Sequence, residues 1–164
     1  MSKENGIITT AKNRATITFQ RRLPHPAEKV WAAITEPEQR IKWFGQTSIE
    51  AKKGGRIETM PEGPPAPPEV RRSSGIITEW DPPRLFEYEE EAATIGKSIV
   101  RFELESDGDE TLLRVINKGL NISDARGYAP GWHAFLDRFE AHLNGKSLPE
   151  WSKRYAGVQS IYAG

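Results

Sequence analysis

The sequence has no cysteine among its 164 residues. This absence excludes disulfides, thiolate metal sites, iron–sulfur clusters and a cysteine nucleophile. The chain also lacks any run of about 18 apolar residues, so we expect no membrane span. Its N-terminus is polar and has no apolar core of the kind found in secretory signals. We therefore expect a cytoplasmic protein.

An excess of either charge is missing as well. Lysine plus arginine total 23 and aspartate plus glutamate total 23, so the formal net charge is zero. Nucleic-acid binders usually carry an excess basic surface, so we expect no nucleic-acid partner. The three histidines show no HxH or HExxH spacing, and the chain contains no GxSxG motif. We therefore predict no metal site and no cofactor.

Large aromatic residues are what the chain does have. Only 37% of its residues are apolar, yet five are tryptophans. A chain of this length suits one compact domain. The composition therefore predicts a core, or a cavity, built from a few large side chains.

Alternating apolar and polar residues predict a series of strands. The first is residues 15–23, where Ile17, Phe19 and Leu23 share one parity. Later strands are predicted at residues 47–51, 56–60, 70–80, 85–90, 98–105 and 111–118. Lys52-Lys53-Gly54-Gly55 is typical of a hairpin turn. The proline-rich stretch 61–68 cannot be a central strand, and we interpret it as a stiff loop or a lid at a cavity mouth.

Helical spacing occurs in three places. Two short helices are predicted at residues 27–35 and 37–44, separated by Pro37. A long amphipathic helix is predicted from Tyr128 to Leu143. This order predicts an α+β fold, in which a curved antiparallel sheet of about six to seven strands packs against the long C-terminal helix, with the two short helices after the first strand.

The chain divides into three parts. Residues 1–14 are predicted to be a polar, disordered leader, residues 15–146 the folded domain, and residues 147–164 a C-terminal tail. The tail contains Trp151, Tyr155, Val158 and Tyr162. Those side chains either fold back on the domain or form a partner surface, so a homodimer is one hypothesis.

Several stretches together resemble a known superfamily. They are RRLPHPAEKVWAAITEPEQRIKWF, GGRIE, SGIITEWDPPRLFEYEEE, TLLRVINKGL and GWHAFLDRFEAHLNG. Their order resembles the START and birch-pollen-allergen (SRPBCC) superfamily, and within it the family named after the activator of the heat-shock-protein-90 ATPase. The resemblance implies a helix-grip fold with an apolar cavity between the sheet and the C-terminal helix. Its members include binders, cochaperone domains and a few enzymes, so the resemblance implies no single reaction.

The first functional hypothesis is binding of a small apolar or aromatic molecule in that cavity, with a stress-related role as one expectation. An ordinary packed core is the competing interpretation of the same side chains. The candidate ligand-binding residues are Trp31, Trp43, Phe44, Trp80, Phe86, Tyr88, Phe102, Asn117, Trp132, Phe135, Leu136 and Phe139. Tyr88, Asn117 or His133 would orient a polar group of the ligand.

Two other functions remain open. One is a cochaperone-like protein-interaction module. The other is a cyclase- or hydrolase-type enzyme, for which Glu90 and His133 are weak candidates. Glu90 has the parity of Phe86 and Tyr88, and a carboxylate in an apolar cavity could act as a base. No clear acid–base pair is visible, so a protein without enzymatic activity is preferred.

Overall fold

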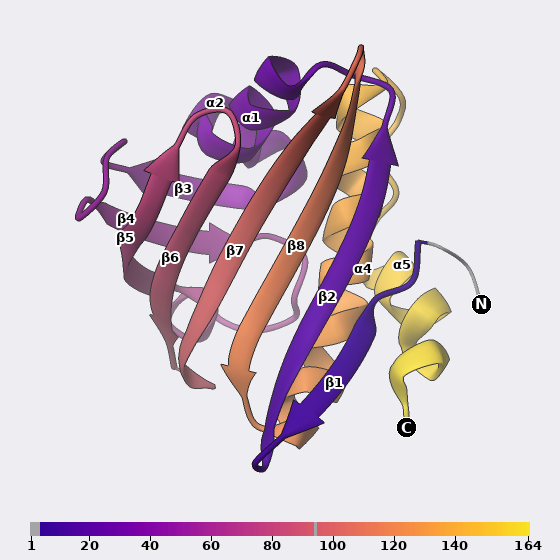
Figure 1. The fold of residues 1–164 in the computed structure, drawn as a ribbon. Helices are drawn as coiled ribbons and strands as arrows, with labels where there is room; N and C mark the ends of the chain where they lie inside the picture. Colours follow the sequence, from indigo (N-terminus) through magenta and orange to yellow (C-terminus); the bar gives the residue numbers. More distant parts are fainter. Residues whose placement is uncertain (1–3, 94) are drawn as a thin grey trace.

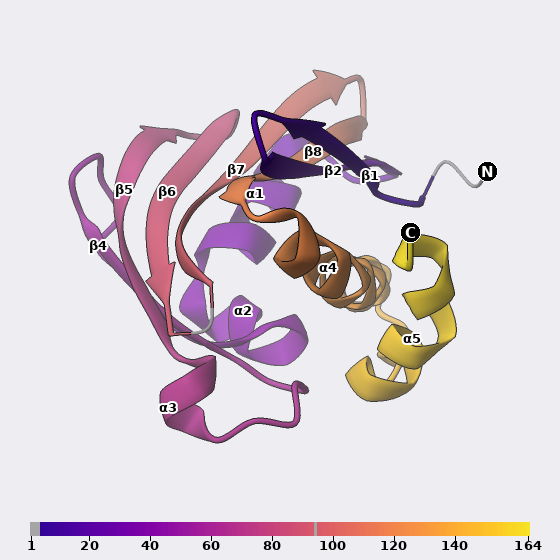
Figure 2. The same ribbon diagram turned by 90° about the horizontal axis from the view of Figure 1, so that it is seen from below.

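The computed structural model describes residues 4–93 and 95–164. An antiparallel sheet curves around a long helix, as Figures 1 and 2 show. The strands follow the order β1-β2-β8-β7-β6-β5-β4-β3. They are β1 (Ile7–Ala11), β2 (Arg14–Leu23), β3 (Gly45–Ile49), β4 (Arg56–Pro61), β5 (Ser73–Asp81), β6 (Leu85–Ala92), β7 (Gly96–Asp107) and β8 (Glu110–Leu120).

Five α-helices accompany these strands in the described residues. They are α1 (Ala27–Thr35), α2 (Pro37–Trp43), α3 (Pro68–Arg71), α4 (Ile122–Leu143) and α5 (Trp151–Val158), and a 3-10 turn η1 (Gln159–Tyr162) follows α5. The predicted α+β helix-grip architecture is confirmed, although the sheet has eight strands and not six to seven.

The inner face of the sheet carries the apolar half of each alternating strand. In β2, residues 15, 17, 19, 21 and 23 are all buried. The register places Phe86 opposite Phe102, Phe102 opposite Val115, and Phe19 opposite the same Val115. Aromatic and β-branched pairs of this kind stabilise neighbouring strands. One continuous apolar row therefore crosses the middle of the sheet and faces α1 and α4.

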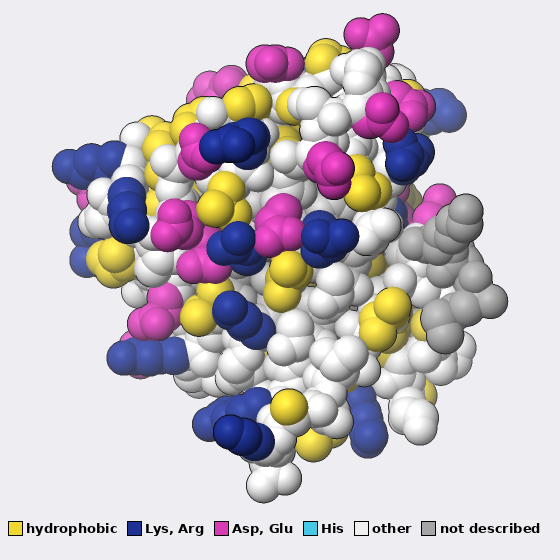
Figure 3. Space-filling model, in the orientation of Figure 1, with side chains coloured by type: hydrophobic (Ala, Val, Ile, Leu, Met, Phe, Trp, Pro, Cys, Tyr) yellow, Lys and Arg dark blue, Asp and Glu magenta, His cyan; other side chains and the backbone are white. Residues whose placement is uncertain are grey.

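The outer face carries the charged half of the same strands. Arg101 binds the carboxylates of Glu87 at 2.9 Å and Glu103 at 2.6 Å, and Arg114 binds Glu103 at 3.1 Å. Figure 3 shows this face, where hydrophobic side chains are scattered among charges of both signs. Such alternation is expected of a sheet with one face in water.

Strand β1 lies within the stretch predicted to be a disordered leader. Residues 7–11 pair with residues 14–18 of β2 through a two-residue turn at Lys12 and Asn13, where φ is 52° and 64°. Positive φ at both central residues is the geometry that suits a tight hairpin. The strand was missed because most of its side chains are exposed, which leaves no apolar alternation to recognise.

Two further elements differ from their predicted bounds. The stretch predicted as a strand at 70–80 begins as helix α3, and β5 starts only at Ser73. Helix α4 starts at Ile122, six residues before the predicted start, because the Asn121 side chain accepts a hydrogen bond from the Asp124 backbone N–H at 2.7 Å. That cap satisfies a free donor of the first turn.

The C-terminal segment folds back on its own domain. Trp151, Val158 and Tyr162 are buried, and α5 packs along α4. The backbone N–H of Gly6 donates to the Tyr162 hydroxyl at 2.7 Å, which ties the two ends of the chain together. These apolar side chains are therefore used within the molecule and do not form the partner surface considered from the sequence.

None of the helices formed by residues 4–93 and 95–164 is long and apolar enough to cross a membrane.

Candidate functional site

A cavity of about 570 Å³ lies between the inner face of the sheet and α4. The segment joining β4 to α3 and helix α5 form its remaining walls, and Figure 2 shows these segments around the lower part of the molecule. The aromatic lining residues come from α4, α5, β6 and the end of α2: Phe44, Tyr88, Tyr128, Trp132, Phe135, Trp151 and Tyr155.

Two of the α4 residues that line the cavity are glycines. Gly127 and Gly131 lie one turn apart on the face toward the cavity. A Cβ atom at Gly131 would meet the Trp151 ring at 3.3 Å, so α5 approaches the backbone closely there. The Trp151 indole N–H also donates to the Gly131 carbonyl at 3.3 Å.

Trp132 is held in place from the sheet. Its indole N–H donates to Asn117 Oδ1 at 3.2 Å, while Asn117 Nδ2 donates to the Ile99 carbonyl at 3.0 Å. Asn117 is almost fully buried and does not line the cavity. It was predicted to orient a ligand, but its contacts orient Trp132.

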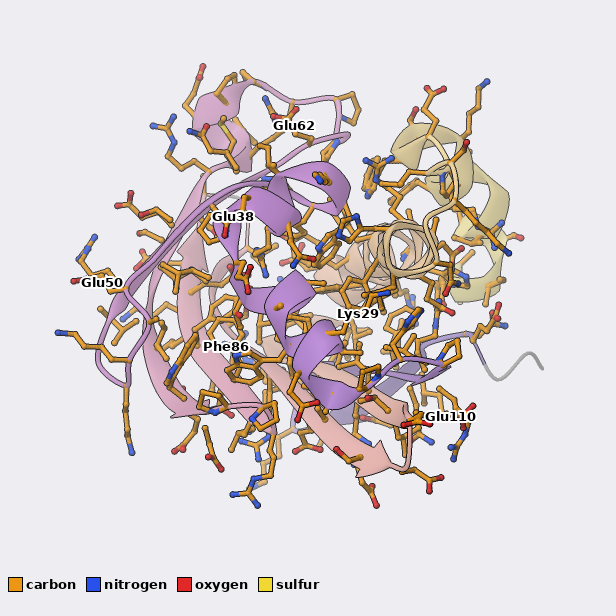
Figure 4. All side chains as sticks on the ribbon, turned by 90° about the horizontal axis from the view of Figure 1, so that it is seen from above. Lys29, Glu38, Glu50, Glu62, Phe86 and Glu110 are labelled. Carbon is orange, nitrogen blue, oxygen red and sulfur yellow. The ribbon has the colours of Figure 1, made fainter. Side chains whose placement is uncertain are left out.

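Arg71 fastens the proline-rich segment over the cavity. Its Nε donates to the Ala66 carbonyl at 2.8 Å and its Nη1 donates to the Pro61 carbonyl at 2.7 Å. The same Nη1 lies 3.6 Å from the Glu62 carboxylate, and Figure 4 labels Glu62 in this segment. The structure thus places the segment predicted to be a loop or lid in the cavity wall.

A chain of polar side chains forms one wall of the cavity. Ser73 donates to Glu90 Oε2 at 3.0 Å, and the hydroxyls of Ser73 and Thr59 lie 2.7 Å apart. Burial raises the pKa of the Glu90 carboxyl above its usual 4.5, while the Ser73 hydrogen bond and the Arg40 charge act against this rise. Burial also raises the pKa of the neighbouring Tyr88 hydroxyl, which stays neutral. The cavity therefore combines aromatic walls with one acidic group.

Four of the predicted ligand-binding residues line this cavity: Phe44, Tyr88, Trp132 and Phe135. The others belong to the packed core or support it: Trp31, Trp43, Trp80, Phe86, Phe102, Asn117, Leu136 and Phe139. Trp31 and Trp80 pack against each other with ring centroids 5.1 Å apart, and the Trp43 indole N–H donates to the Ala33 carbonyl at 2.9 Å. Alternation along a strand, or the apolar stripe along a helix, identifies the residues that face inward. It does not distinguish core residues from residues that line a cavity on the same face.

His133 does not reach the cavity. Its Nδ1 lies 2.8 Å from the Tyr162 hydroxyl, its ring meets Phe19 edge-on at 5.8 Å, and its Nε2 lies 3.5 Å from Asp137. These contacts place it on the side of α4 that faces β2 and η1. The two weak catalytic candidates, Glu90 and His133, therefore lie in different environments and do not form an acid–base pair.

The buried position of His133 makes stability depend on pH. Burial lowers the pKa of its imidazole below the usual 6.5, so the folded state favours the neutral ring. Below about pH 6.5 the unfolded chain takes up a proton that the folded chain excludes, and the free energy of unfolding falls. We expect His133→Gln to weaken this pH dependence in urea denaturation between pH 7.5 and pH 5.5. Equal pH dependence in the variant and the parent protein would contradict it.

Comparison with known proteins identifies the family. A model of the family described as activator of Hsp90 ATPase homolog 1-like protein matches residues 24–144. The chain belongs to this family. No curated protein was found to be similar in sequence.

Solved structures share the fold of this family member. CalU16 from Micromonospora echinospora, solved as a crystal structure, is 23% identical in sequence. The comparison gives a TM-score of 0.75 and covers 97% of this chain and 92% of that one. The solution structure of BPP1335 from Bordetella parapertussis is 23% identical, with a TM-score of 0.76 over 94% and 86%. EF2215 from Enterococcus faecalis, a protein of unknown function, is 15% identical, with a TM-score of 0.75 over 96% and 87%. At these identities the likeness concerns the fold.

Several lining residues of this Hsp90-ATPase-activator-like chain were missed from the sequence. Tyr128 has the helical spacing of Trp132 and Phe135, so it could have been found as the next residue of that stripe. Trp151 and Tyr155 are also four residues apart, but they lie in the segment interpreted as a tail and outside the family match. In the part of the chain that the structure describes, no three acidic or histidine side chains are grouped to hold a metal ion.

Proposed function

We propose that this family member binds a small apolar or aromatic molecule in the cavity between the sheet and α4. The observation that carries the proposal is the cavity of about 570 Å³ with aromatic rings on several walls and a short polar chain on one of them. Sites for small molecules are commonly about 300–1,000 Å³, mostly apolar, and supplied with a few polar groups that orient the ligand.

Affinity would come mainly from apolar surface removed from water. Each Å² of such surface contributes roughly 25 cal/mol, so a ligand the size of two fused rings gains several kcal/mol before the entropy of binding is subtracted. Family membership supports ligand binding in general terms. The stress-related role and the cytoplasmic location stay predictions from the sequence.

Filling the cavity is expected to abolish binding. Val70 lines the cavity from α3, whereas its neighbour Glu69 is exposed. We expect N-phenyl-1-naphthylamine, an uncharged fluorescent probe of apolar sites, to bind the parent protein stoichiometrically. Val70→Trp places an indole in the cavity and should weaken binding at least about tenfold, equivalent to 1.4 kcal/mol.

Glu69→Trp is the matched control, because it adds the same indole to the same helix outside the cavity. It should bind the probe as the parent protein does. Circular dichroism on both variants checks that they fold. If folded Val70→Trp binds the probe with parental affinity, or if the parent protein does not bind it, the cavity is not the binding site.

A further inference from the structure

One carboxylate in the cavity has no direct ion pair among the described residues. Glu90 lies on the cavity wall and accepts a hydrogen bond from Ser73 through Oε2. Within residues 4–93 and 95–164, Glu90 forms none of the ion pairs found at 4.0 Å or less. Burial disfavours the charged form of this carboxyl, and a cation bound directly to it would offset that cost.

The two arginines of this region make their direct contacts with groups other than the Glu90 carboxylate. Arg71 lines the cavity, but it binds the Pro61 and Ala66 carbonyls and its charge faces Glu62. Arg40 does not line the cavity. Its Nε donates to Thr47 at 3.0 Å and its Nη1 to the Ile34 carbonyl at 2.9 Å. The Arg40 side chain also interacts with Tyr88, and its charge acts on the Glu90 carboxyl. Neither arginine, however, forms a direct ion pair with Glu90.

Aromatic side chains line the same cavity as this carboxylate. Tyr88 is on the same strand two residues away, and Tyr128 and Trp132 line the cavity from α4. Aromatic rings attract cations through the negative potential of their faces, most strongly where water is excluded. The same surroundings disfavour an anion, because Glu90 itself would repel it.

From this juxtaposition we infer that the cavity selects a small apolar molecule that carries one protonated amine. The ammonium group pairs with the Glu90 carboxylate, and the apolar body packs against Trp132, Phe135 and Trp151. This inference rests on the proposed function and adds the chemical class of the ligand to it. An alcohol of the same shape binds through its apolar body and one hydrogen bond without the attraction between opposite charges, and a carboxylate anion is repelled.

Three probes that share one ring system test the inference: 2-naphthylmethylamine, 2-naphthylmethanol and 2-naphthoate. Isothermal titration calorimetry at pH 7.5 on the full chain gives the dissociation constant of each. We expect the amine to bind at least about tenfold more tightly than the alcohol, and 2-naphthoate to bind most weakly. Equal affinities for the amine and the alcohol, or tightest binding of 2-naphthoate, would overturn the inferred ligand class and leave the proposed function standing. If none of the three binds, the proposed function itself fails.

Glu90→Gln identifies the group responsible. It keeps the size of the side chain and removes its charge, so the preference for the amine should disappear while the affinity for the alcohol changes less than about threefold. Glu89→Gln is the matched control, since Glu89 is the exposed neighbour on the same strand. An amine preference that survives in Glu90→Gln, or that is lost equally in Glu89→Gln, contradicts the assignment to Glu90.

Discussion

Replacing Phe86 by alanine is expected to lower the free energy of unfolding by about 3–5 kcal/mol, the range for removing a fully buried phenylalanine. Phe86 has no exposed surface. The centroid of its ring lies 5.4 Å from the ring centroid of Trp80, 5.3 Å from that of Tyr88 and 5.8 Å from that of Phe102. Figure 4 shows it between the sheet and α1. Its removal leaves a void that these large rings cannot collapse to fill.

Urea denaturation followed by tryptophan fluorescence and circular dichroism measures this loss. Phe86→Leu is the matched control, because it keeps part of the volume and should cost clearly less than the alanine variant. Phe86 does not line the cavity, so a folded Phe86→Leu protein should still bind the uncharged probe. A loss below about 1 kcal/mol in Phe86→Ala would show that the centre of the sheet is not packed as described.

Replacing Arg21 by methionine is expected to cost about 3 kcal/mol, near the lower end of the range for breaking a buried ion pair. The Arg21 side chain is only 2% exposed and contacts the carboxylates of Asp137, at 2.9 Å, and Glu140. It also donates to the Glu4 carbonyl at 2.9 Å. Methionine fills much of the space but leaves two partly buried acids on α4 without this cation. The cost stays near the lower end because those acids retain some contact with water.

The adjacent residue supplies the control for this experiment. Arg22 points to the other face of β2, is 54% exposed, and pairs with Asp107 and Glu110 at 3.1 and 3.4 Å. Exposed pairs of this kind are worth about 0–1 kcal/mol, so Arg22→Met should change stability by less than that amount. Equal losses in the two variants would mean that burial does not decide the contribution of these arginines.

The contacts of the buried Arg21 have no motif in the sequence. Arg21 occupies an inward position of β2, where the alternation alone predicts an apolar side chain. Its partners lie 116 and 119 residues later on α4. Only the folded chain brings them together, because a residue's sequence neighbours carry no information about a contact so distant.

The sequence by itself determined the order of the elements from β2 to α4, apart from α3, and the inward residues of most of these strands. These follow from periodicities of 2 and 3.6 residues, which local chemistry imposes and which can be read without knowing any distant contact. The helix-grip fold was implied by the resemblance to a known family. The sequence also pointed to Phe44, Tyr88, Trp132 and Phe135, four of the aromatic residues that line the cavity.

The tertiary structure alone decided where the core ends and the cavity begins. Trp80 and Trp132 are both apolar and inward, yet of the two only Trp132 lines the cavity, because Trp80 packs against the rings of Trp31 and Phe86. It also brought α5 over the cavity and separated Glu90 from His133. Empty space and long-range proximity depend on how whole elements pack against each other, and a pattern along one chain does not encode them.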